Sequence, residues 1–170
     1  MAEESRKMPE EENEYDAVER ALARKDQEDP WVMYLIVRES LGMSAGKVGA
    51  QCGHAVGMTY EKYIKLKKDL SAVQSQAKSD TVDRFTAELV AKATLDAINY
   101  FNCWRQESYR KVVLRASDKE WDKIKAELSC FVVRDAGFTE VAAGSETVIG
   151  IWPMRKSSAP KIIKKLQALK

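Results

Sequence analysis

Residues 31–55 read WVMYLIVRESLGMSAGKVGAQCGHA, and this stretch decides the fold. Its first seven residues, Trp31–Val37, are apolar and rich in strand formers, which predicts a strand buried on both faces, as in an α/β sheet. A turn rich in glycine and serine follows, and from Lys47 to about Lys68 small and apolar residues recur at helical spacing. The stretch therefore predicts a strand–turn–helix unit, and open α/β folds place ligands at the end of such a strand.

Further strands and helices are expected after this unit. Strands are predicted at Lys111–Ala116, at Cys130–Arg134 and at Thr147–Trp152, the last ended by Pro153, and helices at Glu120–Leu128 and at about 157–168. This order predicts a three-layer α/β/α fold with a small mixed four-stranded sheet. The last two strands are joined too closely for a helical crossover, which allows an antiparallel pair without requiring one.

Two segments are distinct from the rest of the predicted domain at 31–170. Residues 1–30 form an acidic arm with eleven acidic and five basic side chains, and Tyr15, Val18 and Leu22 give it a short helical stripe. Residues from about 69 to 99 form an insert, predicted as a polar loop followed by a helix. The body behind the arm is basic, which suits a polyanionic partner such as RNA, although such charges equally serve to solvate a surface.

The composition argues against several classes of protein. The three cysteines, Cys52, Cys103 and Cys130, match no disulfide framework or zinc pattern, so reduced thiols and no bound metal are expected. No segment approaches the ~20 apolar residues that span a bilayer. The first residues are acidic and resemble neither a signal peptide nor a transit peptide, so the predicted location is cytoplasmic.

Three polar residues of the first helix share one face. Lys47, Gln51 and His54, the only histidine, are spaced i, i+4 and i+7. Lys47 lies in the first turn, where backbone N–H groups and the helix dipole attract anions, so a phosphate or oxyanion site is one interpretation. The other is structural, with a snorkelling lysine, a surface glutamine and a half-buried histidine.

Asp135 ends a predicted strand and precedes Ala-Gly. Beside a lysine it would stay ionised and hold the ammonium in place, or it forms an Asx turn before Gly137. Thr139 and Thr147 offer hydroxyls to the same cleft. Other chemistries fit poorly, because the chain lacks a G-x-S-x-G elbow and Gly42–Lys47 is one residue short of a P-loop.

Together these segments resemble the type II peptidyl-tRNA hydrolases of archaea and eukaryotes. The resemblance rests on Gly42–Ala55, Lys111–Leu114 and Asp135–Gly150, and extends over roughly 31–68 and 100–170. It implies hydrolysis of the ester between a peptide and the 3′ end of tRNA, without a metal or other cofactor. It implies catalytic roles for Lys47, Gln51, His54, Asp135 and Thr139, with Lys47 and Asp135 as the central pair.

The partner that the resemblance implies is tRNA, in the form of peptidyl-tRNA. The residues expected to face this RNA are Arg38, Lys111, Arg134, Thr147 and Arg155. A non-catalytic adaptor, or an RNA-binding protein without hydrolysis, is the alternative on the same fold. The sequence is also compatible with a homodimer, and with a protein partner bound through the arm or the insert.

Three positions depart from the family's usual pattern. The family usually carries Arg at the position of Phe138, Gln at that of Glu140 and Gly at that of Trp152. The first two differences remove positive or neutral polar character beside the expected RNA path. They therefore bear on affinity and substrate range more than on the central pair.

Overall fold

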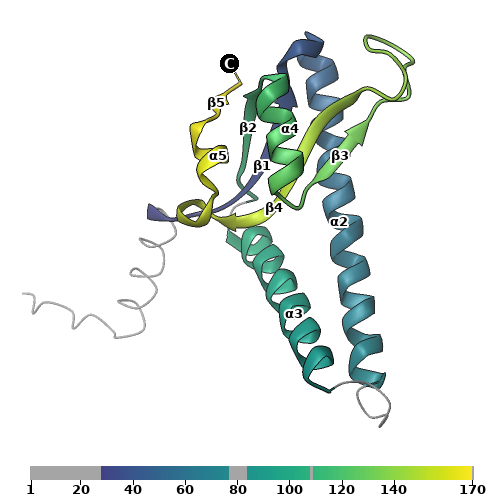
Figure 1. Ribbon diagram of the computed structural model, residues 1–170, viewed down its shortest axis with the longest axis vertical. Coiled ribbons are helices and arrows are strands. Elements are labelled where there is room, and N and C mark those ends of the chain that lie inside the picture. The colour runs from purple at the N-terminus through teal and green to yellow at the C-terminus, as the bar shows by residue number, and fades with distance from the viewer. Residues whose placement is uncertain (1–27, 77–83, 108, 170) are drawn as a thin grey trace, which may run out of the picture.

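A mixed β-sheet forms the middle layer of the protein (Figure 1). The computed structural model describes residues 28–76, 84–107 and 109–169, and within them the strand order is β3-β4-β1-β2-β5. The strands are β1 (Trp31–Arg38), β2 (Lys111–Ala116), β3 (Phe131–Arg134), β4 (Glu146–Arg155) and β5 (Gln167–Ala168). β1 and β2 are parallel, whereas the other neighbouring pairs are antiparallel. The mixed α/β architecture is therefore confirmed, and β3 and β4 are the antiparallel pair that the sequence allows.

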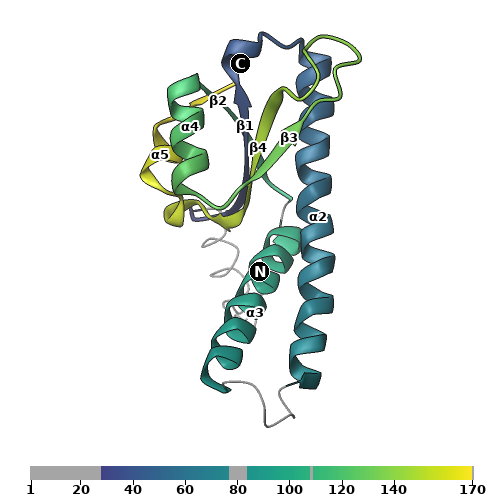
Figure 2. The same ribbon diagram turned by 45° about the vertical axis from the view of Figure 1, so that its right-hand side comes forward.

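Helices cover both faces of this sheet (Figure 2). In the described residues, α2 (Ala45–Gln76) and α3 (Arg84–Glu107) cover one face, and α4 (Asp118–Glu127) and α5 (Lys161–Lys165) cover the other. Alternate residues of β1 point to the two layers. Met33, Leu35, Phe101 and Trp104 belong to one core, and Tyr34, Ile36, Trp121 and Ile163 to the other. Every residue from Trp31 to Val37 is buried, which confirms the predicted two-sided strand.

Close packing brings α2 onto β4. A Cβ added at Gly150 of β4 would lie 3.4 Å from the Cβ of Ala55, a fully buried residue of α2. Further along, α2 and α3 lie side by side as a helical hairpin that extends past the sheet (Figures 1 and 2). Trp152 fastens this hairpin to the sheet, because its indole N–H donates to the carbonyl of Ala97 at 3.1 Å. The departure at Trp152 thus has a structural use in this chain.

The sheet has one strand more than the predicted four, and the last helix is shorter than expected. In place of one helix over about 157–168, the chain forms a 3₁₀ turn (Lys156–Ser158), then α5, then β5. β5 pairs with β2, and the N–H of Leu169 donates to the carbonyl of Val113 at 3.0 Å. This pairing satisfies backbone groups that β2 would otherwise leave at an open edge. The amphipathic pattern of residues 157–168 contains no information about pairing at the edge of β2. The prediction of a four-stranded sheet is therefore wrong.

β4 also continues past Pro153, where the sequence predicts its end. The register between β1 and β4 shifts between Val32 and Tyr34, which marks a β-bulge in β4 at Trp152 and Pro153. Bulges tolerate the missing N–H of proline, because one residue of the bulged strand is left out of the ladder. The strand therefore ends only at Arg155.

The segment from 69 to 99 is more helical than predicted. α2 continues through residues 69–76, where a polar loop is expected, and α3 supplies the predicted helix. Residues 69–76 include leucine, alanine and glutamine, which are good helix formers, so polarity alone misassigned the end of α2. The rest of the expected loop, 77–83, and the acidic arm up to residue 27 lie outside the described residues. Within those described, no helix is both long and apolar enough to cross a membrane.

Glu146 joins α4 to the start of β4. Its carboxylate accepts hydrogen bonds from Lys125 Nζ at 2.5 Å, from Arg134 at 3.2 Å and from Trp121 Nε1 at 3.3 Å. The bond from Lys125 is the largest influence, and together these donors lower the pKa of Glu146 from 4.5 to about 2. The ionised carboxylate is therefore the form that the fold stabilises.

Replacing Glu146 with glutamine is expected to destabilise the protein at neutral pH and to matter less as the pH falls. Because the folded-state pKa is depressed, the stabilisation is present above pH 4.5 and is lost as the pH falls towards about 2. Urea unfolding of wild type and Glu146→Gln across this range measures the difference. Glu127→Gln removes only an exposed pair with Lys123, so it should have little effect. A Glu146→Gln difference that is constant with pH would contradict the prediction.

Candidate active site

An open cleft lies between the first half of α2 and the carboxyl end of β3. Its volume is about 1130 Å³. The loop that joins β3 to β4 arches beside the start of α2 at this end of the sheet (Figures 1 and 2). The residues implied to be catalytic, Lys47, Gln51, His54, Asp135 and Thr139, all line the cleft. The fold thus brings together the two motifs that are distant in sequence.

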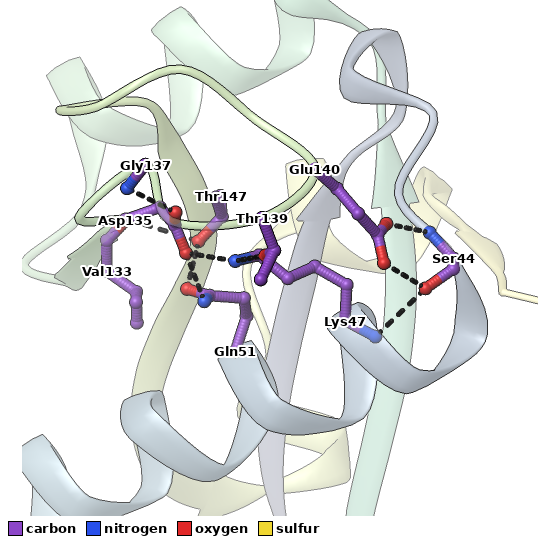
Figure 3. Close-up of polar contacts among 9 residues, drawn as sticks. All are labelled: Ser44, Lys47, Gln51, Val133, Asp135, Gly137, Thr139, Glu140 and Thr147. Carbon is purple, nitrogen blue, oxygen red and sulfur yellow. Dashed lines mark hydrogen bonds and ion pairs between the residues drawn. The ribbon is translucent and has the colours of Figure 1, made fainter.

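Asp135 is the centre of the polar network in this cleft (Figure 3). Its Oδ2 lies 2.5 Å from Lys47 Nζ and accepts a hydrogen bond from Gln51 Nε2 at 2.7 Å. Its Oδ1 accepts the backbone N–H of Gly137 at 2.7 Å. Asp135 therefore fits both interpretations made from the sequence. One of its oxygens closes an Asx turn, while the other binds the lysine.

The loop after Asp135 holds the carboxylate in place. The Asp135 N–H donates to the carbonyl of Ser145 at 2.9 Å, and its own carbonyl accepts the N–H of Gly144 at 2.7 Å. Gly137 has φ of +81°, and a Cβ there would lie 2.4 Å from the backbone nitrogen of Ala143. A larger residue at Gly137 would force the two sides of the loop apart, so the turn depends on glycine.

Lys47 reaches Asp135 from the first turn of α2. Ser44 precedes the helix, and its Oγ accepts the Lys47 backbone N–H at 3.2 Å, an N-cap contact. The Lys47 side chain is only 12% exposed, and its Nζ also donates to Thr139 Oγ1 at 2.9 Å. No other described residue accepts from this ammonium. Two of its three hydrogens are thus used, and the third is available to the cleft.

Gln51 is a buried link between Asp135 and the sheet. It is 3% exposed, so it is not the surface residue of the structural interpretation. Its Oε1 accepts the hydroxyl of Thr147 at 2.7 Å while its Nε2 donates to Asp135. Thr147 itself is fully buried in β4. The structure therefore places Thr147 behind Gln51, where it positions the amide, and not on a surface facing RNA.

The network favours the ionised form of Asp135. The bond from Lys47 contributes most, followed by the Gly137 N–H, and both lower the pKa of the Asp135 carboxyl below 3.8 in spite of its burial. At neutral pH the residue is therefore a carboxylate whose oxygens already accept bonds.

Glu140 has a structural partner that the sequence did not suggest. Its carboxylate accepts the hydroxyl of Ser44 at 2.5 Å and the Ser44 backbone N–H at 2.8 Å (Figure 3). These two bonds lower the pKa of Glu140, with Lys47 adding a smaller effect. The departure at Glu140 thus joins the β3–β4 loop to the N-terminus of α2. Ser44 and Glu140 are 96 positions apart in the sequence, so no local sequence pattern indicates this contact.

The remaining predicted residues are not all close to this network. His54 lines the cleft but is exposed, and its side chain forms no hydrogen bond with another residue in the described ranges. Arg38 and Arg134 lie at the same end of the sheet as Asp135, the former bonded to Asp118 at 2.7 Å. Lys111 and Arg155 pair with the start of β1, at the opposite end of the sheet.

Comparison with known proteins bears on this site. A family model described as peptidyl-tRNA hydrolase PTH2 matches residues 31–169. Peptidyl-tRNA hydrolase 2 of Saccharomyces cerevisiae is 29% identical over 136 residues, which are 76% of this chain and 54% of the yeast protein. Peptidyl-tRNA hydrolase of Methanocaldococcus jannaschii is 29% identical over 144 residues, 81% of this chain and 98% of that protein. The human protein named "Peptidyl-tRNA hydrolase 2, mitochondrial" is 29% identical over 127 residues, 71% and 54% of the two chains. The chain spans about half the length of the yeast and human relatives.

Proposed function

The chain belongs to the peptidyl-tRNA hydrolase PTH2 family, and on this basis we propose that it hydrolyses the ester between a peptide, or an N-blocked amino acid, and the 3′ end of tRNA. The observation that carries the proposal is the position of Asp135 Oδ2, which accepts from both Lys47 and Gln51 beside an open cleft. An ammonium held in this way suits a reaction in which negative charge develops on a carbonyl oxygen.

Asp135 acts in this proposal as a positioning residue. Its oxygens accept bonds from Lys47, Gln51 and the Gly137 N–H, and its lowered pKa makes it a weak base. It therefore contributes by fixing the position of the Lys47 ammonium and by orienting a water through its remaining lone pairs. It does not act as the general base that removes the proton from that water.

Lys47 supplies the positive charge for the transition state. Besides Asp135 and Thr139, no described residue accepts from this ammonium, so a substrate oxygen in the cleft can accept its third hydrogen bond. Thr139 accepts from Lys47 through its oxygen, which leaves the hydroxyl hydrogen free to donate to the same substrate oxygen. Two donors thus converge where the ester carbonyl would become an oxyanion.

The RNA end of the substrate is assigned to the α2 side of the β3–β4 loop. Lys47 and the positive end of the α2 dipole lie there, and Arg38 and Arg134 lie at the same end of the sheet. Lys111 and Arg155, at the opposite end, would contribute only to the general field of the body. His54 lines the cleft from the next turns of α2, and in this proposal it contacts substrate or water there.

An adaptor or an RNA-binding protein without hydrolysis remains the alternative function. The buried Thr147–Gln51–Asp135–Lys47 chain favours the enzyme, since simple binding of RNA phosphates does not require a lysine held by a buried carboxylate. The acidic arm at 1–30, the insert and their protein partners, a homodimer and a cytoplasmic location stay predictions.

The direct test is release of tRNA from N-acetyl-aminoacyl-tRNA by the purified full chain. We expect enzyme-dependent release of free tRNA, with a KM that rises with salt because phosphate contacts dominate affinity. Binding of tRNA without release would support the RNA-binding alternative, and neither binding nor release would favour the adaptor.

A further inference from the structure

One large apolar side chain at the rim of the cleft is almost fully exposed. Phe138 lines the cleft and is 91% exposed. None of the aromatic contacts among the described residues includes its ring. The ring therefore contributes nothing visible to the core, while it lies next to Thr139 of the catalytic network.

Hydrogen bonds hold the loop on both sides of Phe138. On one side Gly137 donates to Asp135 Oδ1 at 2.7 Å, and on the other Thr139 accepts from Lys47 at 2.9 Å. Glu140, one residue further, is bonded twice to Ser44. The exposure of Phe138 is thus not a result of a loose loop. A ring presented from a fixed backbone loses little freedom when a ligand packs on it.

The charges along the cleft indicate which part of the substrate meets this ring. The end that contains Phe138 also contains Lys47 and the N-terminus of α2, both of which attract phosphate. The Glu140 carboxylate at this end is turned to Ser44. The far end is lined by Met58, Glu61 and Val132. An apolar end with a carboxylate suits a peptide better than a phosphate backbone.

We propose that Phe138 forms a nucleobase subsite, in which its ring stacks on an unpaired base of the tRNA 3′ end. This inference rests on the proposed function and names the part of the substrate that the loop contacts. Single-stranded RNA is commonly bound by stacking of splayed bases on exposed aromatic side chains. In this chain, stacking on Phe138 would take the place of the charged contact that an arginine at this position would make.

The experiment measures steady-state hydrolysis by wild type and Phe138→Leu. The substrates are N-acetyl-aminoacyl-tRNA with an intact 3′ end and three versions in which one of the last three nucleotides is abasic. On the intact substrate, Phe138→Leu should raise KM roughly tenfold with little change in kcat, as loss of one base-stacking contact does. On the substrate that lacks the stacked base, wild type and variant should have equal KM.

Two control variants separate stacking from structure. Phe138→Trp keeps an aromatic face and should retain the low KM on the intact substrate. Leu89→Ala removes an exposed apolar side chain from α3, outside the cleft, and should leave KM unchanged.

The outcomes are distinguishable. An active wild type whose KM is unaffected by Phe138→Leu would overturn the inference alone. So would an effect that persists on all three abasic substrates. A wild type that releases no tRNA would overturn the proposed function, and the inference with it.

Discussion

Replacing Lys47 with alanine is expected to lower the rate of peptidyl-tRNA cleavage by roughly 10²- to 10³-fold. The change removes the ammonium that donates to Thr139 and pairs with Asp135, and with it the hydrogen available to the substrate oxygen. Because the oxyanion exists only near the transition state, the loss should fall on kcat more than on KM. Single-turnover release of tRNA, with the enzyme in excess, measures it.

Lys62→Ala is the matched control for this variant. Lys62 is exposed on the same helix and does not line the cleft, so the control removes one surface charge of equal sign. It should keep nearly the full rate, and urea unfolding should show that both variants are folded. If Lys47→Ala retained the wild-type rate, the assignment of the central pair would be wrong.

Asp135→Asn is expected to reduce the rate by roughly 10²- to 10⁴-fold, the range seen when a positioning carboxylate becomes an amide. Asparagine has the same shape, but it must turn an NH₂ group towards either Gly137 or the two donors on Oδ2. Each orientation sets donor against donor, so Lys47 loses its fixed position. The same single-turnover assay measures this effect.

Two comparisons make the Asp135 result specific. Asp118→Asn weakens a carboxylate that accepts from Arg38 and Ser40 outside the cleft, and should leave kcat nearly unchanged. The double variant Lys47→Ala/Asp135→Asn should be little slower than the slower single variant, because the two residues act as a unit. Independent, multiplicative losses would contradict the proposed pairing.

The expected pH dependence of hydrolysis follows from the lowered pKa of Asp135. The bonds from Lys47 and the Gly137 N–H hold the pKa of the Asp135 carboxyl below its usual range, so the carboxylate stays ionised at mildly acidic pH. Protonation of Asp135 should therefore not limit the reaction at mildly acidic pH. For the same reason, the ratio of the wild-type rate to the Asp135→Asn rate should be constant between neutral pH and about pH 5.

Local patterns predicted the central elements well. The apolar run at Trp31–Val37 can satisfy its backbone and bury its side chains only inside a sheet, and it is buried throughout. The helical spacing of Lys47 and Gln51 places both on the side of α2 that meets Asp135. The same spacing included His54, which is exposed, because spacing defines a face of the helix but not how far the next loop covers it.

Predictions that depended on a partner segment were less accurate. The end of β4 and the existence of β5 depend on a bulge against β1 and on the open edge of β2. Glu140 and Thr147 were expected beside or facing an RNA path, whereas Glu140 binds Ser44 and Thr147 is buried behind Gln51. In each case the deciding atom belongs to a residue distant in sequence.

The sequence by itself determined the strand–turn–helix unit and the residue types of the site, because these depend on hydrophobic periodicity and on turn chemistry within a few residues. Only the tertiary structure decided that Asp135 accepts from Lys47 and Gln51 together, and that Thr147 is buried behind them. Gln51 and Asp135 are 84 positions apart, so their contact exists only once α2 packs beside the end of β3. The physical reason is that a hydrogen bond needs its two atoms within about 3 Å, and no local pattern fixes a distance between separate elements.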